Sequence, residues 1–372
     1  MVKPIEALII YPMPKQFGVS IRIERFVQRL PKHIKARELV IENWKESYVG
    51  KVSYLLRQLK AIHSFFPDII YSAGPLVTGS IPGLYAKSKK KRPLIIDWDD
   101  SFYDFRNYKP AFGTIPYWEY RAARKADAVL VVSRRMEKIA QHLRQSSKDI
   151  YYIPNGVDIK QFSMKRFNKQ KLRKAWNIRD DDIVIFFLGN IGVYKDLFVG
   201  KELTLAAEEI IKQHRNIKFF IVGYGAGLPM FKEWVKQHEL DPYFIFAGFV
   251  SNKDMPKFIA LSDICVDAFG DPKLQNMQNR SSMKLKEYMS MEKPAIAINV
   301  GENITDLDNG KAGILIDYTV QSLTAAIERL ISDPKLRSGL GKRARQRARQ
   351  YYNLNKQAAQ VARIIGKYSK HT

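Results

Sequence analysis

A lysine and a glutamate three positions apart give the strongest chemical signal in this sequence. Lys284 and Glu287 lie in the stretch SSMKLKEYMSMEKP (residues 281–294), which is typical of a serine-started helix followed by a buried strand. Ser281 or Ser282 is a natural N-cap, so free amides and the positive end of the helix dipole would lie beside the Lys284 ammonium. Such a group suits a diphosphate, with Glu287 one turn later for ribose hydroxyls. On spacing alone, a Lys–Glu pair on a solvated helix face explains the pattern slightly better than a diphosphate site does.

A glycine-rich turn is the second, weaker signal. Gly223-Tyr224-Gly225-Ala226-Gly227 follows a strong strand and precedes a helix, an arrangement that can place backbone N–H groups against a phosphate. The dinucleotide fingerprint is incomplete, because the third-position glycine and the later ribose-binding acid are missing. A tight turn without a ligand is an equally good interpretation.

Short apolar runs alternate with amphipathic segments along the chain, and these elements must position the candidate residues. The strands expected in the N-terminal half are 7–11, 39–41, 68–71, 93–97 and 128–132. Those expected in the C-terminal half are 183–189, 218–223, 243–246, 264–267, 295–298 and 313–316. Continuous apolar, β-branched runs indicate strands buried on both faces, and therefore an α/β fold with two doubly wound parallel sheets.

A Pro/Asn-Gly turn at residues 154–156, followed by a polar and basic stretch, indicates the junction between the halves. We expect an N-terminal domain over residues 1–155, a C-terminal domain over 156–352 and a final helix within 353–372. Ligands of doubly wound sheets bind beyond the carboxyl ends of the strands. The cleft between the halves is therefore the expected active site.

Composition limits the class of protein. One cysteine, Cys265, excludes a disulfide framework and any cysteine-built metal site. No apolar run is long enough to span a bilayer and the N-terminus lacks a cleavable signal, so we expect a cytoplasmic protein. The net charge of +25, with dense patches at residues 87–92 and from Asp333 onward, favours an anionic partner. A solubilising face is the simpler explanation of either patch.

Several segments, taken in order, resemble the retaining GT-B-fold glycosyltransferases of glycosyltransferase family four (glycosyl transferases group 1). They are the Ser-x-Lys-x-x-Glu-Tyr-Met run before Lys293-Pro294, and residues 153–158, 219–225, 246–250 with 255–256, and 313–316. The resemblance covers residues 153–352 closely and the N-terminal half more loosely. It implies two Rossmann-like domains facing a cleft, the first for the acceptor and the second for the donor, with the final helix returning to the first. It further implies transfer of a sugar from a nucleoside diphosphate to an acceptor with retention of configuration.

Carried onto this sequence, the resemblance makes Glu287 the carboxylate that holds the donor ribose. Lys284 and the amides near Ser282 and Met283 would bind the diphosphate.

Two further donor-site positions depart from the family pattern. Asn190 stands where an arginine is usual, which leaves Lys195 as the surviving cation, and Asn279 replaces a glutamate directed at the donor sugar. Gly18 corresponds to a glycine loop over the donor phosphates, here reduced to one glycine.

A strand end rich in acids takes the place of a histidine that many members have near the reacting sugar. The residues are Asp97-Trp98-Asp99-Asp100, and Asp99 or Asp100 is the candidate for contact with donor or acceptor sugar. Helix capping, or pairing with Arg106, accounts for them equally well. Three carboxylates can also bind a divalent cation. The family needs no metal or other cofactor, because cations and a helix dipole neutralise the leaving diphosphate.

The basic patch 87–92 suits an acceptor (glycan, lipid-linked sugar or glycolipid) at the inner face of an anionic membrane. Two alternatives remain open. One is a sugar-nucleotide epimerase of the same fold. The other is a nucleic-acid-binding protein, for which basic stretches with interleaved aromatics and zinc-ligand spacing are both missing from the sequence.

Overall fold

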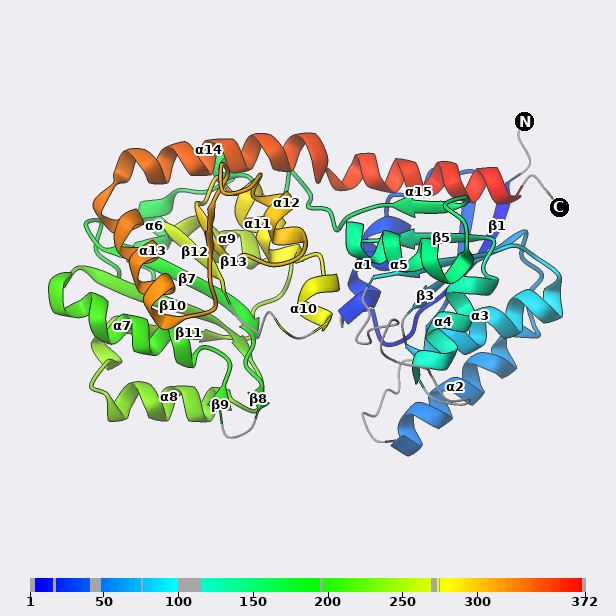
Figure 1. The fold of residues 1–372 in the computed structure, drawn as a ribbon, viewed down its shortest axis with the longest axis horizontal. Coiled ribbons are helices and arrows are strands. Elements are labelled where there is room, and N and C mark those ends of the chain that lie inside the picture. Colours follow the sequence, from blue (N-terminus) through cyan, green and yellow to red (C-terminus); the bar gives the residue numbers. More distant parts are fainter. Residues whose placement is uncertain are drawn as a thin grey trace. The chain divides into compact units, whose positions relative to one another are not determined.

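The computed structural model describes residues 4–15, 18–40, 48–74, 76–99, 115–194, 197–268, 273 and 275–369. The chain divides into two compact units (Figure 1). The first comprises Met1–Asn155, Gln278–Ser281 and Leu354–Thr372, and the second comprises Gly156–Met277 and Ser282–Asn353. Two of the candidate site residues, Asp100 and Lys195, lie outside the described residues.

The first unit contains a six-stranded parallel sheet in the order β2-β1-β3-β4-β5-β6. Its strands are β1 Ile5–Ile10, β2 Ile34–Leu39, β3 Ile69–Gly74, β4 Leu94–Trp98, β5 Ala128–Val131 and β6 Ile150–Tyr152. Its helices are α1 Gly18–Val27, α2 Tyr48–Ile62, α3 Val77–Lys90, α4 Ile115–Lys125, α5 Arg134–Arg144 and α15 Leu354–Ser369. Alternate residues of β1 enter two separate apolar cores, one under α1 and α15 and one under α2 to α5. The sheet is therefore covered on both faces.

The second unit contains a six-stranded parallel sheet in the order β11-β10-β7-β12-β13-β14. Its strands are β7 Ile183–Asn190, β10 Ile217–Tyr224, β11 Phe244–Gly248, β12 Ile264–Asp267, β13 Ala295–Ile298 and β14 Ile314–Ile316. Numbered within the unit, this is the Rossmann order 3-2-1-4-5-6. From β7 the chain adds strands first toward β11 and then, from β12 onward, on the other side toward β14, so the strand order reverses between β7 and β12. Both sheets confirm the predicted doubly wound α/β fold.

Helices and a small hairpin complete the second unit. The hairpin pairs β8 Val193–Tyr194 with β9 Leu197–Phe198. The helices are η1 Met164–Arg166, α6 Lys169–Lys174, α7 Lys201–Gln213, α8 Leu228–Gln237, η2 Asp241–Tyr243, α9 Met255–Leu261, α11 Met283–Ser290, α12 Glu302–Asp306, α13 Val320–Ser332 and α14 Pro334–Tyr351. One further helix, α10 Gln275–Asn279, contains a boundary between the units.

The second strand differs from the prediction. The sequence favoured residues 39–41, whereas β2 runs over Ile34–Leu39 and pairs only with β1. An edge strand has one solvated side, so its polar sequence IKAREL does not show the continuous apolar run that identifies a central strand.

The final helix belongs to the first unit, as predicted. Leu354, Ala358, Val361 and Ile365 of α15 recur at helical spacing and are buried in one core with residues of α1, β1 and β3. Figure 1 shows α15 lying along the first sheet.

Candidate active site

The strand order of the second unit locates its ligand edge. Ligands of open α/β sheets bind at the carboxyl ends of the strands where the order reverses, here between β7 and β12. Buried apolar residues fill both strands, but β7 ends in Gly189-Asn190 and β12 ends in the fully buried Asp267. Polar groups therefore collect at this point of the sheet.

Lys284 reaches the ends of both strands. Its Nζ donates to the carbonyl oxygen of Leu188 at 3.0 Å and lies 3.2 Å from a carboxylate oxygen of Asp267. The ammonium also sits 5.7 Å from the centre of the Phe187 ring. Its side chain keeps 24% of its surface exposed, whereas that of Asp267 keeps none. The ammonium is thus fixed by the sheet and still open to an anion.

The first turn of α11 is tied to the same carboxylate. Of the two candidate N-caps, Ser281 and Ser282, the helix uses Ser282. Its hydroxyl accepts from the Leu285 amide at 3.3 Å and donates to Asp267 at 2.6 Å. Asp267 therefore orients both the start of the helix and Lys284. Asp267 was not among the predicted site residues, although an acid at the end of an apolar strand is a signal that could have identified it.

Glu287 lies one turn further along α11 and is 5% exposed, in contrast to a carboxylate on a solvated face. The other lysine of the helix, Lys286, points elsewhere and forms a fully buried ion pair with Asp306. Burial raises the pKa of Asp306. The two lysines of α11 are therefore distinct: Lys286 belongs to the core, and Lys284 to the edge of the sheet.

The glycine turn serves close backbone packing at this edge. A Cβ on Gly223 would lie 2.1 Å from the carbonyl oxygen of Gly189, and one on Gly225 would lie 2.5 Å from Oδ1 of the exposed Asn190. Both glycines have positive φ angles of 157° and 140°. The turn thus lets β10 end directly beside β7 and positions the Asn190 side chain.

Other candidate residues belong to the first unit. Asn279 is fully buried and its amide oxygen accepts from Nε of Arg135 at 3.0 Å. Gly18 is the first residue of α1. Asp99 accepts from the Asn155 amide at 3.1 Å.

The alternative of a divalent-cation site needs three carboxylates of the Asp97–Asp100 stretch that are open to a ligand. Asp97 is not open in this way. Nε of Arg22 lies 3.0 Å from one of its oxygens, and the Tyr71 hydroxyl donates to the other at 2.5 Å. Arg22 and Asp97 are 2% and 1% exposed. Asp97 therefore has a structural role: its side chain lies in the core of the unit and not at an edge that is open to a ligand. In the described part of the chain, no three His, Cys, Asp or Glu side chains are grouped so that they could hold a metal ion.

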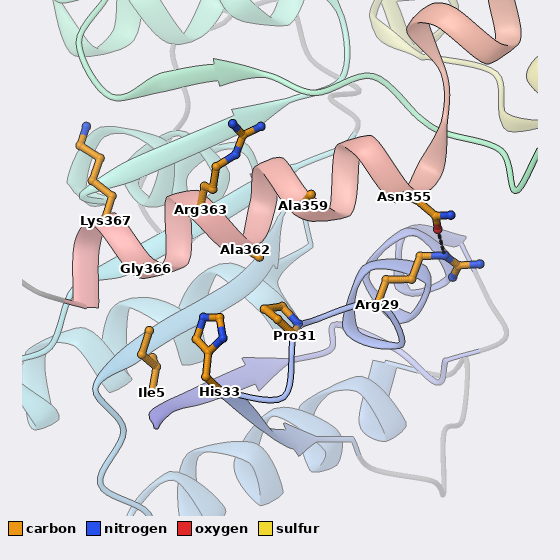
Figure 2. Close-up of a pocket in the computed structure, with 10 residues that line it drawn as sticks. All are labelled: Ile5, Arg29, Pro31, His33, Asn355, Ala359, Ala362, Arg363, Gly366 and Lys367. Atoms are coloured by element: carbon orange, nitrogen blue, oxygen red, sulfur yellow. Dashed lines mark hydrogen bonds between the residues drawn. The ribbon is translucent and has the colours of Figure 1, made fainter. Parts of the chain in front are cut away.

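A cavity of about 730 Å³ lies elsewhere in the first unit, beside α15 (Figure 2). Ala359, Ala362 and Gly366 of the helix line it together with Ile5, and the Arg29 side chain there donates to Asn355. Ile5 begins β1, so the cavity is at the amino edge of the sheet. That is the edge opposite to the one at which doubly wound sheets bind ligands.

Lys293, in the Lys-Pro pair of the sequence motif, has a structural position. It is 5% exposed, and its Nζ donates to the carbonyl oxygens of Ala260 and Ser262 at 3.0 and 2.6 Å. Burial lowers its pKa to about 8. The ammonium therefore loses its proton in the folded protein at a lower pH than in the unfolded chain.

This shift predicts the sign of a pH dependence. A pKa depressed in the folded state makes the unfolded chain bind more protons between pH 8 and 10, so the free energy of unfolding should rise over that interval by roughly 2 kcal/mol. The measurement is urea unfolding at pH 8, 9 and 10 for wild type and Lys293→Met. The variant should lack this rise, and equal slopes in the two proteins would contradict the assignment.

Two family profiles match the chain. The one described as "Glycosyl transferases group 1" matches residues 168–347, and the one described as "Glycosyltransferase Family 4" matches residues 19–161. An alpha-D-kanosaminyltransferase of Streptomyces kanamyceticus is 25% identical over 95% of this chain and 91% of its own. An alpha-monoglucosyldiacylglycerol synthase of Streptococcus pneumoniae is 20% identical over 72% of this chain and 60% of its own.

Solved structures share the fold. Anabaena Alr3699/HepE, in complex with UDP and glucose, has a TM-score of 0.76 and 17% identity, over 97% of this chain and 99% of its own. Sucrose-phosphate synthase from Thermosynechococcus elongatus has a TM-score of 0.74 and 18% identity, over 99% of both chains. Among the described residues of this protein, no helix is long and apolar enough to cross a bilayer.

Proposed function

The chain belongs to the group 1, family 4 glycosyltransferases of GT-B fold, enzymes that transfer sugars, and we propose that it uses a nucleoside diphosphate sugar and retains the anomeric configuration. The observation that carries the proposal is the group at the β7/β12 edge. It combines an anchored ammonium, Lys284, with the N-terminus of α11. Both favour the same ligand, an anion.

The chemistry required of this group is charge neutralisation. Breaking the sugar–phosphate bond leaves negative charge on the diphosphate, and donors held in place before the reaction stabilise that charge at little reorganisation cost. Asp267 and Leu188 hold Lys284 in such a position. Glu287 accepts hydrogen bonds from the ribose in this proposal. A divalent metal is not required, because the cation and the helix dipole supply the positive charge.

The same edge offers a platform for the base. Tyr224 ends β10, Phe249 follows β11, and their rings lie 5.3 Å apart with 45% and 70% of these residues exposed. Strands are spaced about 4.8 Å apart, so β11 is about 10 Å from β7. This span suits a nucleotide whose base stacks on the aromatic pair while its diphosphate meets Lys284. We propose uridine as the base, since Alr3699/HepE binds UDP.

The first unit supplies the acceptor side in this proposal, with Asp99 as its catalytic candidate and Asn155 holding that carboxylate. The relatives' names specify transfer of an alpha-D-kanosaminyl group and synthesis of an alpha-monoglucosyldiacylglycerol, and both names carry the alpha configuration. Retention at an α-linked nucleotide sugar would give such linkages. The acceptor is then a glycan, a lipid-linked sugar or a glycolipid, and the transferred group a hexosyl residue.

Thermal unfolding with UDP, GDP and ADP tests the proposal. A ligand at 100 times its Kd stabilises the folded state by about 2.7 kcal/mol, so UDP should raise Tm by several degrees with or without EDTA. Lys284→Met should lose the shift, while Lys311→Met, a change at an exposed lysine, should keep it. No shift with any nucleotide would contradict the proposal. An isomerised nucleotide sugar formed without acceptor would favour the epimerase.

A further inference from the structure

Two neighbouring helices of the first unit contain basic residues and no acidic ones. Residues 48–66 and 77–92, which contain α2 and α3 and the residues after them, include eight lysines and arginines and no aspartate or glutamate. The two helices pack against each other (Figure 1). Among their cations, the side chains of Arg57, Lys60, Lys91 and Arg92 form no ion pair or hydrogen bond with the described residues. Their charge is directed to solvent.

Large apolar side chains are exposed on the same surface. Val52 and Leu56, one turn apart on α2, are 41% and 60% exposed, and Phe66, four residues after the helix, is 82% exposed. The opposite side of α2 packs into the protein, where Tyr54 and Ile62 are buried. The exposed residues therefore have no role in the core of this unit.

One lysine joins the two features. Nζ of Lys90, the last residue of α3, lies 4.2 Å from the centre of the Phe66 ring and donates to the carbonyl oxygen of His63 at 3.1 Å. This contact places the aromatic ring beside the Lys89-Lys90-Lys91-Arg92 cluster. Basic and apolar groups thus form one patch, which we call the α2–α3 patch: Val52, Leu56, Arg57, Lys60, Phe66 and residues 89–92.

We propose that the α2–α3 patch binds the surface of a membrane that contains acidic lipids. Phe66, Leu56 and Val52 would enter the interface between headgroups and acyl chains, and the cations would remain among the phosphates. Lysine and arginine suit this boundary because their stems are apolar and their heads charged. Aliphatic side chains such as Val52 and Leu56 give no stacking to nucleic acid bases, so a lipid surface fits the patch better than RNA or DNA.

Sedimentation of the full chain with vesicles tests this proposal, with phosphatidylcholine alone compared with a mixture containing 30% phosphatidylglycerol. We expect binding only to the acidic vesicles, weakened by salt. Lys91→Ser with Arg92→Ser should reduce the affinity at least tenfold, since each cation near an anionic surface contributes about 1 kcal/mol. Phe66→Ala with Leu56→Ala should reduce it by about tenfold too, because the apolar contribution is lost.

The matched control is Val193→Ala with Met230→Ala, which removes two exposed apolar side chains from the second unit and should leave vesicle binding unchanged. UDP-induced stabilisation should survive in the α2–α3 variants, so a failure here is separable from a failure of the proposed function. Equal binding to neutral vesicles, no binding to acidic ones, or displacement from them by a 20-nucleotide RNA at equimolar concentration would overturn the proposal.

Discussion

Lys284→Met should lower kcat/KM for sugar transfer, or for hydrolysis of the donor in the absence of acceptor, at least 100-fold. The physical reason is that this ammonium is held at the β7/β12 edge before any ligand binds, so its interaction with the leaving diphosphate needs no rearrangement. Removal of one such preorganised group typically costs a factor of 100 to 1,000 in rate. Methionine keeps the apolar stem and removes the charge.

The variant has a second effect that must be separated from the first. Without Lys284, the fully buried carboxylate of Asp267 loses its ion pair and keeps the hydrogen bond from Ser282, so the fold should also lose stability. Adding Asp267→Asn removes that buried charge and should restore much of the unfolding free energy without restoring activity. Urea unfolding and kinetics on the single and double variants make the comparison. Recovery of activity in the double variant would show that Lys284 acts through the fold and not on the diphosphate.

The fold was predictable because its central strands are buried on both faces. The runs at 264–267 and 295–298 match β12 and β13, since a continuous apolar segment between helices has few other structures available. The edge strand β2 was misplaced for the opposite reason, because a strand with one solvated side carries a mixed sequence. The topological switch between β7 and β12 depends on strand order, which no local pattern specifies.

The candidate site was predictable only in its contiguous part. Ser282, Lys284 and Glu287 share one helix, so their spacing alone places them near each other. Asp267 lies 15 positions before Ser282, and the hydrogen bond between them exists only because β12 ends beside the start of α11. The sequence indicates that Asp267 and Asp97 are acids near strand ends. It does not indicate that Asp267 pairs with Lys284 and Asp97 with Arg22, because those contacts depend on the tertiary structure.

Arg22→Met should destabilise the first unit by about 3–5 kcal/mol, the usual cost of leaving one member of a buried ion pair alone. The guanidinium makes hydrogen bonds to the Asp97 carboxylate, to the Asn155 side chain at 3.0 Å and to the carbonyl oxygen of Ile153 at 2.7 Å. Because the chain divides into two compact units, hydrogen–deuterium exchange resolved by peptide is the suitable measurement, since it reports on each unit by itself. Amides of β3 and β4 should exchange at least 100-fold faster, and those of β7 and β10 should not change.

Asp97→Asn separates burial of charge from loss of contacts. In Arg22→Met the Asp97 carboxylate stays buried and keeps the hydrogen bond from the Tyr71 hydroxyl at 2.5 Å. In Arg22→Met with Asp97→Asn the site is neutral, and the asparagine oxygen can still accept from Tyr71. The double variant should therefore exchange more slowly in β3 and β4 than the single one. If the two variants exchange alike, the cost lies in the lost hydrogen bonds to Asn155 and Ile153, and the ion pair contributes little to the stability of this unit.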